Sequence, residues 1–272
     1  MLSVIIPASN EAGYIGTCLR HLCGSDAGVV QVIVVANGCQ DATARFARET
    51  FAEHLPEGWI GTVLELAQGS KPTALNAGDA AALHPLRLYL DADVSVSPGL
   101  LSALMAVLGG EAPRYASGTP VIPRAQSAVT RAYARFWQTL PFNQTAAPGY
   151  GLFAVNAAGR ARWGAFPTLI ADDTFVRVQF EPQERVQVAD TYLWPMTEGF
   201  AALVRVRRRQ DAGGRELQTL HPGLLAREGK PALTMAGLLR LALADPPGFA
   251  TYAAVSLAVR LKRGGAEFTR GR

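Results

Sequence analysis

The chain of 272 residues is 49% hydrophobic and 18% charged, and it carries a formal net charge of +4. This composition predicts a folded, core-rich protein and excludes a disordered one. The mild basicity suits an anionic small substrate or an acidic membrane surface. It does not indicate nucleic acid as a partner, because no basic stripe interleaved with aromatic residues accompanies it.

Cysteine content and apolar runs set expectations about the compartment. Three cysteines without metal-ligand spacing, Cys18, Cys23 and Cys39, predict reduced thiols. We therefore expect a cytoplasmic protein, with the inner face of the membrane as an alternative position. The apolar start of the chain is short and ends at Pro7, so no signal peptide is expected. No run of about 18 residues is both strongly apolar and free of charge, so no membrane span is expected.

Strand-like and helix-like segments alternate in the first part of the chain. Buried strands are predicted at Leu2–Pro7, Val30–Ala36, Thr62–Leu66 and Leu86–Leu90, and helices at Glu11–Cys23, Asp41–Ala52, Pro72–Leu83 and Pro98–Leu108. Asp41 is the expected N-cap of the second helix. Repeated strand–helix units with short connections predict an α/β fold with a doubly wound, mostly parallel sheet flanked by helices. Ligands bind beyond the carboxyl ends of the strands in such sheets.

The second part of the chain is less regular. Strands are predicted at Tyr115–Val121, at Gly149–Asn156, and at the basic segment Ala202–Gln210, which a turn at Gly213-Gly214 follows, and helices at Gln126–Leu140 and Asp172–Phe180. From about Pro231, two apolar helical segments flank Asp245-Pro246-Pro247. No linker-like stretch divides the chain, so we predict one domain over residues 1–230 and a helical C-terminal extension over residues 231–272.

Short polar residues follow the first two predicted strands. The first strand runs into Asn10 and Glu11, and the second runs into Asn37, Gly38 and Asp41. Such turns present backbone N–H groups and carboxamides at helix N-termini, which suits a nucleotide. The alternative is that these residues only form turns and caps.

Charged residues follow the next two strands. Lys71 comes after a glycine turn at a helix start, where its charge suits a phosphate unless it is simply a solvated surface lysine. Asp91 and Asp93 directly follow the apolar run Leu86–Leu90. Two carboxylates at a buried strand end are costly unless a cation arrives. Hard divalent cations take carboxylate oxygens and keep positions open for phosphate oxygens, so the pair predicts a metal–diphosphate site.

Four motifs in this order resemble family 2 glycosyltransferases. They are Ser3-Val4-Ile5-Ile6-Pro7-Ala8-Ser9-Asn10-Glu11, Asn37-Gly38-Cys39-Gln40-Asp41-Ala42-Thr43, the Lys-containing loop from Gly69 to Gly78, and Asp91-Ala92-Asp93. The resemblance covers about the first hundred residues. It implies a GT-A-type, Rossmann-like sheet, a nucleotide-diphosphate sugar donor that is usually UDP- or GDP-linked, and Mn²⁺ or Mg²⁺ as cofactor. Residues 1–110 would then be the nucleotide-binding half of the catalytic domain and residues 111–230 the acceptor-binding half.

The resemblance also implies roles for individual residues. Asp93 would ligate the metal, and Asp91 would approach the nucleotide ribose or the metal shell. The residues implied to contact the donor are Pro7, Glu11 and Asn37 at the base and ribose, together with Ala8, Asn10, Gly38, Asp41, Lys71, Asp91 and Ala92. Many relatives carry an acidic residue where this chain has Ala36 or Asn37.

An inverting transfer needs a general base for the acceptor hydroxyl, and a carboxylate is the usual choice. Asp172 and Asp173 resemble the family's Glu-Asp pair at a helix start, which implies Asp173 as the base and places Asp172 where relatives have glutamate. Repulsion between the two carboxylates would raise one pKa toward neutrality. The alternative is that both only cap the helix.

A glycine-flanked tyrosine occupies the position of the family's acceptor-facing loop. Gly149 and Gly151 would let a sugar approach closely and Tyr150 could stack on it, or the segment is only a tight turn into a strand. His221 is a weaker candidate, either as a metal ligand or as a surface histidine.

The basic segment offers a second acceptor-side candidate. Strand alternation would place Arg205, Arg207 and Arg209 on one face. Relatives close a basic motif followed by tryptophan over the diphosphate, which makes Arg208 and Arg209 candidates, but no tryptophan follows here. A solvated or lipid-phosphate-facing surface is the alternative.

The apolar tail permits two interpretations. Its helices fall within residues 232–263 and are followed by Lys262 and Arg263. This arrangement fits peripheral contact with a membrane. It fits helices packed onto the domain equally well.

These features predict a metal-dependent glycosyltransferase that moves a sugar from a nucleotide-diphosphate sugar to an acceptor hydroxyl with inversion, in glycan, polysaccharide or glycolipid synthesis. The acceptor would be a lipid carrier, a glycan or a small metabolite. The alternatives are a retaining GT-A enzyme and a non-catalytic nucleotide-binding scaffold. A nucleotidyltransferase is disfavoured because the first turn is not rich in glycine and arginine.

Overall fold

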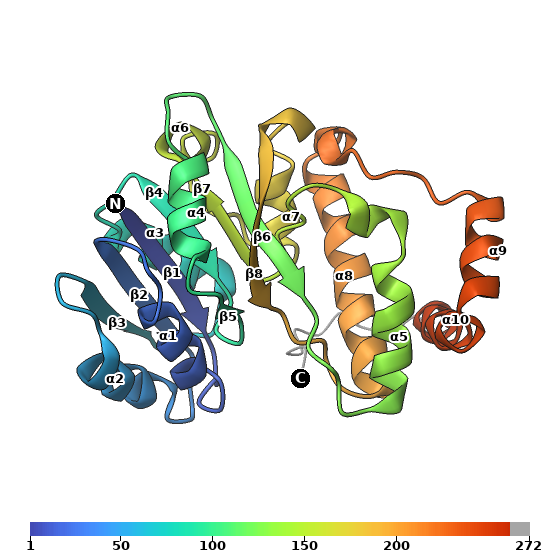
Figure 1. Cartoon of the computed structure of the whole chain (residues 1–272), viewed down its shortest axis with the longest axis horizontal. Coiled ribbons are helices and arrows are strands. Elements are labelled where there is room, and N and C mark those ends of the chain that lie inside the picture. The colour runs from blue at the N-terminus through green and yellow to red at the C-terminus, as the bar shows by residue number, and fades with distance from the viewer. Residues whose placement is uncertain (262–272) are drawn as a thin grey trace.

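The computed structural model describes residues 1–261. Its centre is an eight-stranded sheet with helices on both faces (Figure 1). The strands are β1 (Leu2–Ala8), β2 (Val30–Asn37), β3 (Ile60–Leu66), β4 (Leu86–Leu90), β5 (Ser95–Val96), β6 (Tyr115–Val121), β7 (Leu152–Val155) and β8 (Arg185–Leu193). The α-helices are α1 (Ile15–Cys23), α2 (Thr43–His54), α3 (Lys71–Ala81), α4 (Leu100–Val107), α5 (Ala128–Gln138), α6 (Ala157–Arg160), α7 (Asp172–Arg177), α8 (Phe200–Leu220), α9 (Met235–Ala244) and α10 (Pro246–Leu261). Short 3₁₀ turns are η1 (Pro141–Gln144), η2 (Pro182–Glu184) and η3 (Leu224–Glu228).

The sheet has the strand order β3-β2-β1-β4-β7-β6-β8-β5. The four strands of the first part, β3, β2, β1 and β4, are parallel to one another, as predicted. β7 enters between β4 and β6 in the opposite direction, and β5 is antiparallel to β8. The sheet is therefore mixed but mostly parallel, as predicted, because β7 and β5 alone run against the other six strands.

The prediction of a basic strand is wrong, because residues 202–210 lie inside the long helix α8. The predicted turn at Gly213-Gly214 is also wrong, because both glycines continue this helix. A Cβ at Gly213 would come within 3.0 Å of the Ala171 side chain. The buried glycine thus lets α8 pass close to the segment before α7, and this packing overrides its turn propensity.

Two further differences concern the sequence predictions. The strands β8 and β5 were not predicted: β8 alternates buried and exposed positions, and β5 has only two residues. Asp41 is not the N-cap of α2, which is Ala42. Instead, Oδ1 of Asp41 accepts hydrogen bonds from the backbone and hydroxyl of Thr43, while Oδ2 accepts one from Ala12 N.

Two hydrophobic clusters enclose the sheet. Leu2, Val4 and Ile6 of β1 belong to a cluster that also holds residues of α1 and α4. Ile5 belongs to the cluster on the opposite face, together with Leu75 of α3. Strand β1 is therefore buried on both faces, as its uninterrupted apolar sequence predicts.

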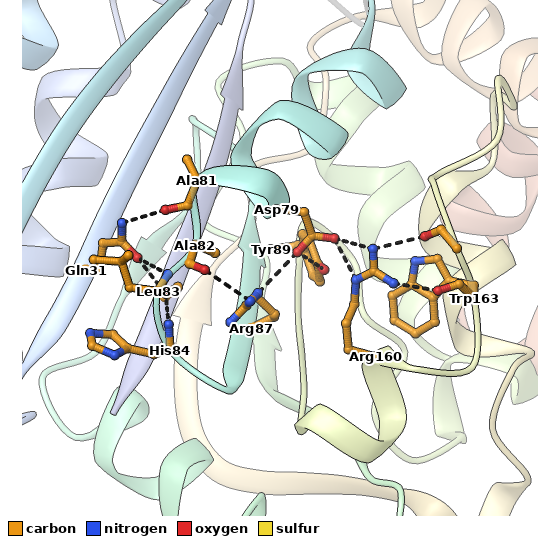
Figure 2. Close-up of polar contacts among 12 residues, drawn as sticks. Gln31, Asp79, Ala81, Ala82, Leu83, His84, Arg87, Tyr89, Arg160 and Trp163 are labelled. Atoms are coloured by element: carbon orange, nitrogen blue, oxygen red, sulfur yellow. Dashed lines mark hydrogen bonds and ion pairs between the residues drawn. The ribbon is translucent and has the colours of Figure 1, made fainter.

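A polar network around Asp79 fastens α3 to the sheet (Figure 2). The Asp79 carboxylate accepts hydrogen bonds from Arg87 Nε at 3.2 Å, the Tyr89 hydroxyl at 2.9 Å and Arg160 Nε at 2.6 Å. Arg87 and Tyr89 belong to β4, and Arg160 belongs to α6. One largely buried carboxylate thus holds α3, β4 and α6 together, and α3 and β4 are two of the elements whose ends form the site.

None of the helices within residues 1–261 is both long and apolar enough to cross a membrane. All three cysteines are free thiols, as predicted. Burial raises the pKa of the Cys18 thiol and of the Cys23 thiol. Both groups therefore behave as apolar core side chains.

The variant Asp79→Asn should lower the free energy of unfolding by about 3 kcal/mol, because it leaves the guanidinium groups of Arg87 and Arg160 without their buried counterion. Urea unfolding followed by circular dichroism measures the change. The matched control is Glu65→Gln, which removes the exposed ion pair of Glu65 with Arg48 and should cost less than about 1 kcal/mol. Equal losses in the two variants would contradict the role given to Asp79.

Candidate active site

Two adjoining cavities lie at the carboxyl ends of the parallel strands. The larger one, of about 470 Å³, is lined by nine of the predicted site residues, namely Pro7, Asn10, Glu11, Asn37, Lys71, Asp91, Ala92, Asp93 and Arg209. The smaller one, of about 20 Å³, is lined by Asp172, Asp173, Gly149 and Gly151. Pro7, Lys71 and Asp91 line both cavities. The fold therefore brings residues from both halves of the sequence to one place.

Lys71 connects the two predicted acidic sites. Its Nζ lies 3.0 Å from Oδ1 of Asp91 and 3.1 Å from Oδ2 of Asp172. Lys71 is the first residue of α3, and the Ser70 hydroxyl before it caps this helix by accepting a hydrogen bond from Thr73 N. The lysine is thus part of a carboxylate network and not a solvated surface residue.

Burial raises the pKa of Asp172 to about 6. Lys71 opposes this rise, whereas the neighbouring carboxylates of Asp173 and Asp91 add to it. For Lys71, burial alone would lower the pKa, but Asp172 and Asp91 outweigh it, so its pKa lies above the usual value. Lys71 therefore stays charged and neutralises part of the acidic charge around the cavity.

Asn37 holds the polar turns in position. Its side-chain amide donates to the carbonyls of Ala8 and Val35, and its Oδ1 accepts a hydrogen bond from Ser70 N at 3.0 Å. The neighbouring Gly38 has a φ of 57°, and a Cβ there would lie 2.4 Å from the backbone nitrogen of Gly69. Only glycine allows the two turns to touch, so Asn37 and Gly38 fix the start of α3.

The first two turns are also bound to each other. Asn10, in a left-handed conformation with φ of 53°, accepts a hydrogen bond from Gln40 N at 2.6 Å through its Oδ1. The backbone N–H of Glu11 donates to the hydroxyl of Thr43 at 2.7 Å, and Asp41 accepts the hydrogen bond from Ala12. Ala8, Gly38 and Asp41 are not among the residues that line the two cavities.

The turn after β4 is tied to the glycine loop. The backbone N–H of Asp91 donates to the carbonyl of Gly151 at 2.8 Å. Gly151 has a φ of 66°, and a Cβ there would come within 2.9 Å of Val94 and Trp194. The segment bends closely before β7 and brings its glycines to the edge of the small cavity.

An aromatic cluster forms the far wall of the large cavity. Trp137 and Trp194 line it, with ring centroids 5.8 Å apart. The ring of Tyr150 stacks on Trp194 at 5.1 Å, and its hydroxyl donates to Asn143 Oδ1 at 2.7 Å. Tyr150 thus lies behind this wall and supports Trp194. Neither tryptophan was predicted as a site residue. The four-residue spacing of Tyr133 and Trp137 places both on one side of α5, and this spacing can be read from the sequence.

Helix α8 also contributes to this wall. Leu203, Val206, Arg207 and Gln210 line the cavity at helical spacing, and Arg209 also lines it. The expectation that alternation places Arg205, Arg207 and Arg209 on one face is wrong because the segment is helical. Arg208 donates to the carbonyl of Ala258 on α10 at 2.6 Å, which makes it a packing contact and not a cavity residue.

The acidic residues of the large cavity suit a hard divalent cation. Asp91, Asp93 and Glu11 line it, and carboxylate oxygen is the ligand type that Mg²⁺ and Mn²⁺ accept. Within residues 1–261, no group of three or more His, Cys, Asp or Glu is arranged to hold a metal by itself. His221 does not line either cavity, and its ring lies 5.3 Å from that of Phe175.

The variant Lys71→Met should be destabilised more at pH 8 than at pH 5. Folding raises the pKa of Asp172 from its ordinary value of 3.8 to about 6, so its contribution to stability is present below pH 3.8 and is lost as the pH rises through 6. Lys71 offsets this loss, and removing it should cost about 3 kcal/mol at pH 8 and less at pH 5, where Asp172 is mostly protonated. Urea unfolding at the two pH values measures both.

The control for Lys71→Met is Arg45→Met, which removes an exposed cation paired with Glu49. Its effect should stay below about 1 kcal/mol at both pH values. An equal loss at pH 5 and pH 8 for Lys71→Met would contradict the coupling between Lys71 and Asp172.

Solved structures of glycosyltransferases share this fold. The mannosyltransferase PcManGT from Pyrobaculum calidifontis, in complex with GDP-Man and Mn²⁺, superimposes with a TM-score of 0.65 at 21% identity over 97% of this chain and 76% of that one. TarS 1–349 of S. aureus, in complex with UDP, gives 0.55 at 14% over 96% and 91%. Glucosyl-3-phosphoglycerate synthase from Mycobacterium tuberculosis, in complex with Mn²⁺, UDP and glucosyl-3-phosphoglycerate, gives 0.56 at 18% over 85% and 81%.

A family model agrees with these structures, although no curated protein matches the chain by sequence. The family model described as "Glycosyl transferase family 2" matches residues 3–163, more than half of the chain. This range begins at β1 and includes the turns after β1, β2 and β4 that build the large cavity. The chain is therefore a glycosyltransferase and belongs to glycosyl transferase family 2, with the GT-A fold.

Proposed function

We propose that this glycosyltransferase moves a sugar from a nucleotide-diphosphate donor to an acceptor hydroxyl, with metal dependence and with inversion at the anomeric carbon. One observation carries the proposal: Asp91 and Asp93 share a cavity with the turns after β1 and β2, and Asp173 lines the adjoining cavity. The complexes of similar folds with GDP-Man and Mn²⁺ or with UDP support it.

The polar side of the large cavity would hold the donor. Pro7, Glu11 and Asn37 would face the base and ribose, and Asn10 adds a further polar group. Asp93, with Asp91, would hold Mn²⁺ or Mg²⁺. When bound, the cation would stabilise negative charge on the departing diphosphate.

Asp173 is the proposed general base. Its Oδ1 accepts a hydrogen bond from the backbone N–H of Thr174 at 2.6 Å, which orients the carboxylate at the start of α7. Asp172 is instead held by Lys71, so it is the less available of the two for an acceptor proton. In the proposed step, the acceptor hydroxyl gives its proton to Asp173 and attacks the anomeric carbon as the bond to the diphosphate breaks.

The aromatic side of the cavity is the proposed acceptor side. Trp137 and Trp194 offer flat apolar surfaces, and Arg207 and Arg209 add positive charge. A lipid carrier, a glycan and a small metabolite each have hydroxyls that fit this chemistry, in glycan, polysaccharide or glycolipid synthesis. We further propose residues 1–230 as the catalytic domain, with 1–110 binding the nucleotide and 111–230 the acceptor, and residues 231–272 as an extension. The free thiols support a cytoplasmic location.

The variant Asp93→Asn should weaken Mn²⁺-dependent binding of the donor's nucleotide by about tenfold or more, because it removes a charged ligand of the cation. Isothermal titration with UDP and with GDP, each with Mn²⁺ or with a chelator, measures this. Glu57→Gln, an exposed carboxylate outside the cavities, should bind like the unmodified chain. Equal binding with Mn²⁺ and with chelator would contradict the metal site.

The variant Asp173→Asn should keep nucleotide binding and lose transfer by about 10²-fold or more, because asparagine cannot accept the proton. Turnover is measured as release of UDP or GDP from a panel of nucleotide sugars and acceptor hydroxyl compounds. Loss of turnover in Asp172→Asn but not in Asp173→Asn would contradict this assignment of the base. The anomeric configuration of the product, read by NMR, distinguishes inversion from retention.

A further inference from the structure

Helix α9 exposes apolar side chains that the active site does not use. Met235, Leu239 and Leu243 recur at four-residue spacing and are 80%, 61% and 73% exposed. The opposite side of the helix, with Leu238 and Leu241, is apolar as well. Apart from Arg240, α9 is apolar all round, and such a helix is normally covered on all sides. Yet α9 lies at the outer edge of the molecule, packed on α10 (Figure 1).

Helix α10 also has an apolar outer side. The residues exposed along it at helical spacing are Pro247, Ala250, Ala254, Leu257 and Leu261. Its inner side packs on α5 and α8, where Val255 is buried in one cluster with residues of both helices. Helix α10 is therefore anchored to the body of the protein while its outer side stays uncovered. We define the tail face as the large apolar side chains that these two helices expose: Met235, Leu239, Leu243, Leu257 and Leu261.

The net positive charge of the sequence is concentrated in its C-terminal part. Residues 229–272 contain seven of the 26 Lys and Arg but two of the 22 Asp and Glu, so residues 1–228 carry one net negative charge. Arg240 and Arg260 are exposed and are next in sequence to Leu239 and Leu261 of the tail face. Asp245 is neutralised by Arg135, whose Nε lies 2.8 Å from its Oδ2. Lys262 and Arg263 belong to the same basic sequence and lie outside the described residues.

We propose that α9 and α10 dock on the surface of an anionic lipid bilayer through the tail face. Exposed leucines would enter the boundary between headgroups and acyl chains, and Arg240 and Arg260 would face lipid phosphates. A second copy of the chain is disfavoured as the occupant, because pairing two tail faces would bring together two regions of the same positive charge. Since α10 packs on α5 and α8, docking would hold the acceptor side of the cavity close to the bilayer.

The test is sedimentation of the full chain with phosphatidylcholine vesicles that contain or lack phosphatidylglycerol. Binding should be about tenfold or more stronger with phosphatidylglycerol and should fall at high salt. The double variant Leu239→Glu/Leu243→Glu should lower binding by about tenfold or more, because it places two charges in the apolar contact. The matched control, Leu83→Glu/Leu220→Glu, changes leucines that are 66% and 58% exposed elsewhere and should bind unchanged.

Thermal unfolding of each variant confirms that the fold is retained. Absence of binding to either kind of vesicle, or equal binding by the tail-face variant and the unmodified chain, would overturn the proposal. So would light scattering that shows a dimer which the tail-face variant dissociates while vesicle binding stays the same, since the occupant would then be a second copy. The assay contains neither donor nor acceptor, so its result is independent of the proposed sugar transfer.

Discussion

The contact of Lys71 with Asp91 and Asp172 is the interaction on which the site depends. It joins the turn after β4 to the start of α7, two segments that are distant in the sequence. Three carboxylates crowded near one cavity would repel each other and resist burial. A lysine that stays charged among them offsets this cost, so the acidic groups can remain close enough to serve one reaction.

Two further constraints keep Lys71 in place. At its own end of α3, Asn37 and Gly38 hold the helix start against the turn after β2. Farther along α3, Asp79 binds the arginine and tyrosine of β4. The helix is thus fixed to the sheet at two points. A rigid helix between two strands lets a long, flexible lysine side chain keep one position.

The cavity joins two chemically different walls. The wall built from the strand-end turns is polar and acidic, whereas the wall built from α5 and α8 is aromatic and carries arginines. The turns of the first wall that follow β1, β2 and β4 lie within the residues that the family model matches, 3–163, whereas all of α8 lies beyond residue 163. The same helices that form the second wall also support α10. The proposed acceptor side and the tail face therefore rest on the same two helices, α5 and α8.

The helix–strand differences between sequence and structure follow from packing. The segment of α8 contains an arginine run with alternating valines, which reads locally as a strand. The segment is helical because Leu203 and Val204 pack against α5 and α10, and this packing is a tertiary contact. Strand β8 alternates weakly and was not predicted, because its pairing with β6 comes from residues remote in sequence. Tertiary contacts outweigh local propensity in both cases.

The sequence by itself determined the parallel first half of the sheet and the turns at its strand ends. Uninterrupted apolar strands and short polar turns are local patterns, and parallel strands must deliver their ends to the same edge. Only the tertiary structure decided that Lys71 pairs with Asp172, that Asn37 and Gly38 support the turns, and that Trp137 and Trp194 line the cavity. Those relations join distant segments, and contacts across such distances in the chain are set by packing and not by local sequence.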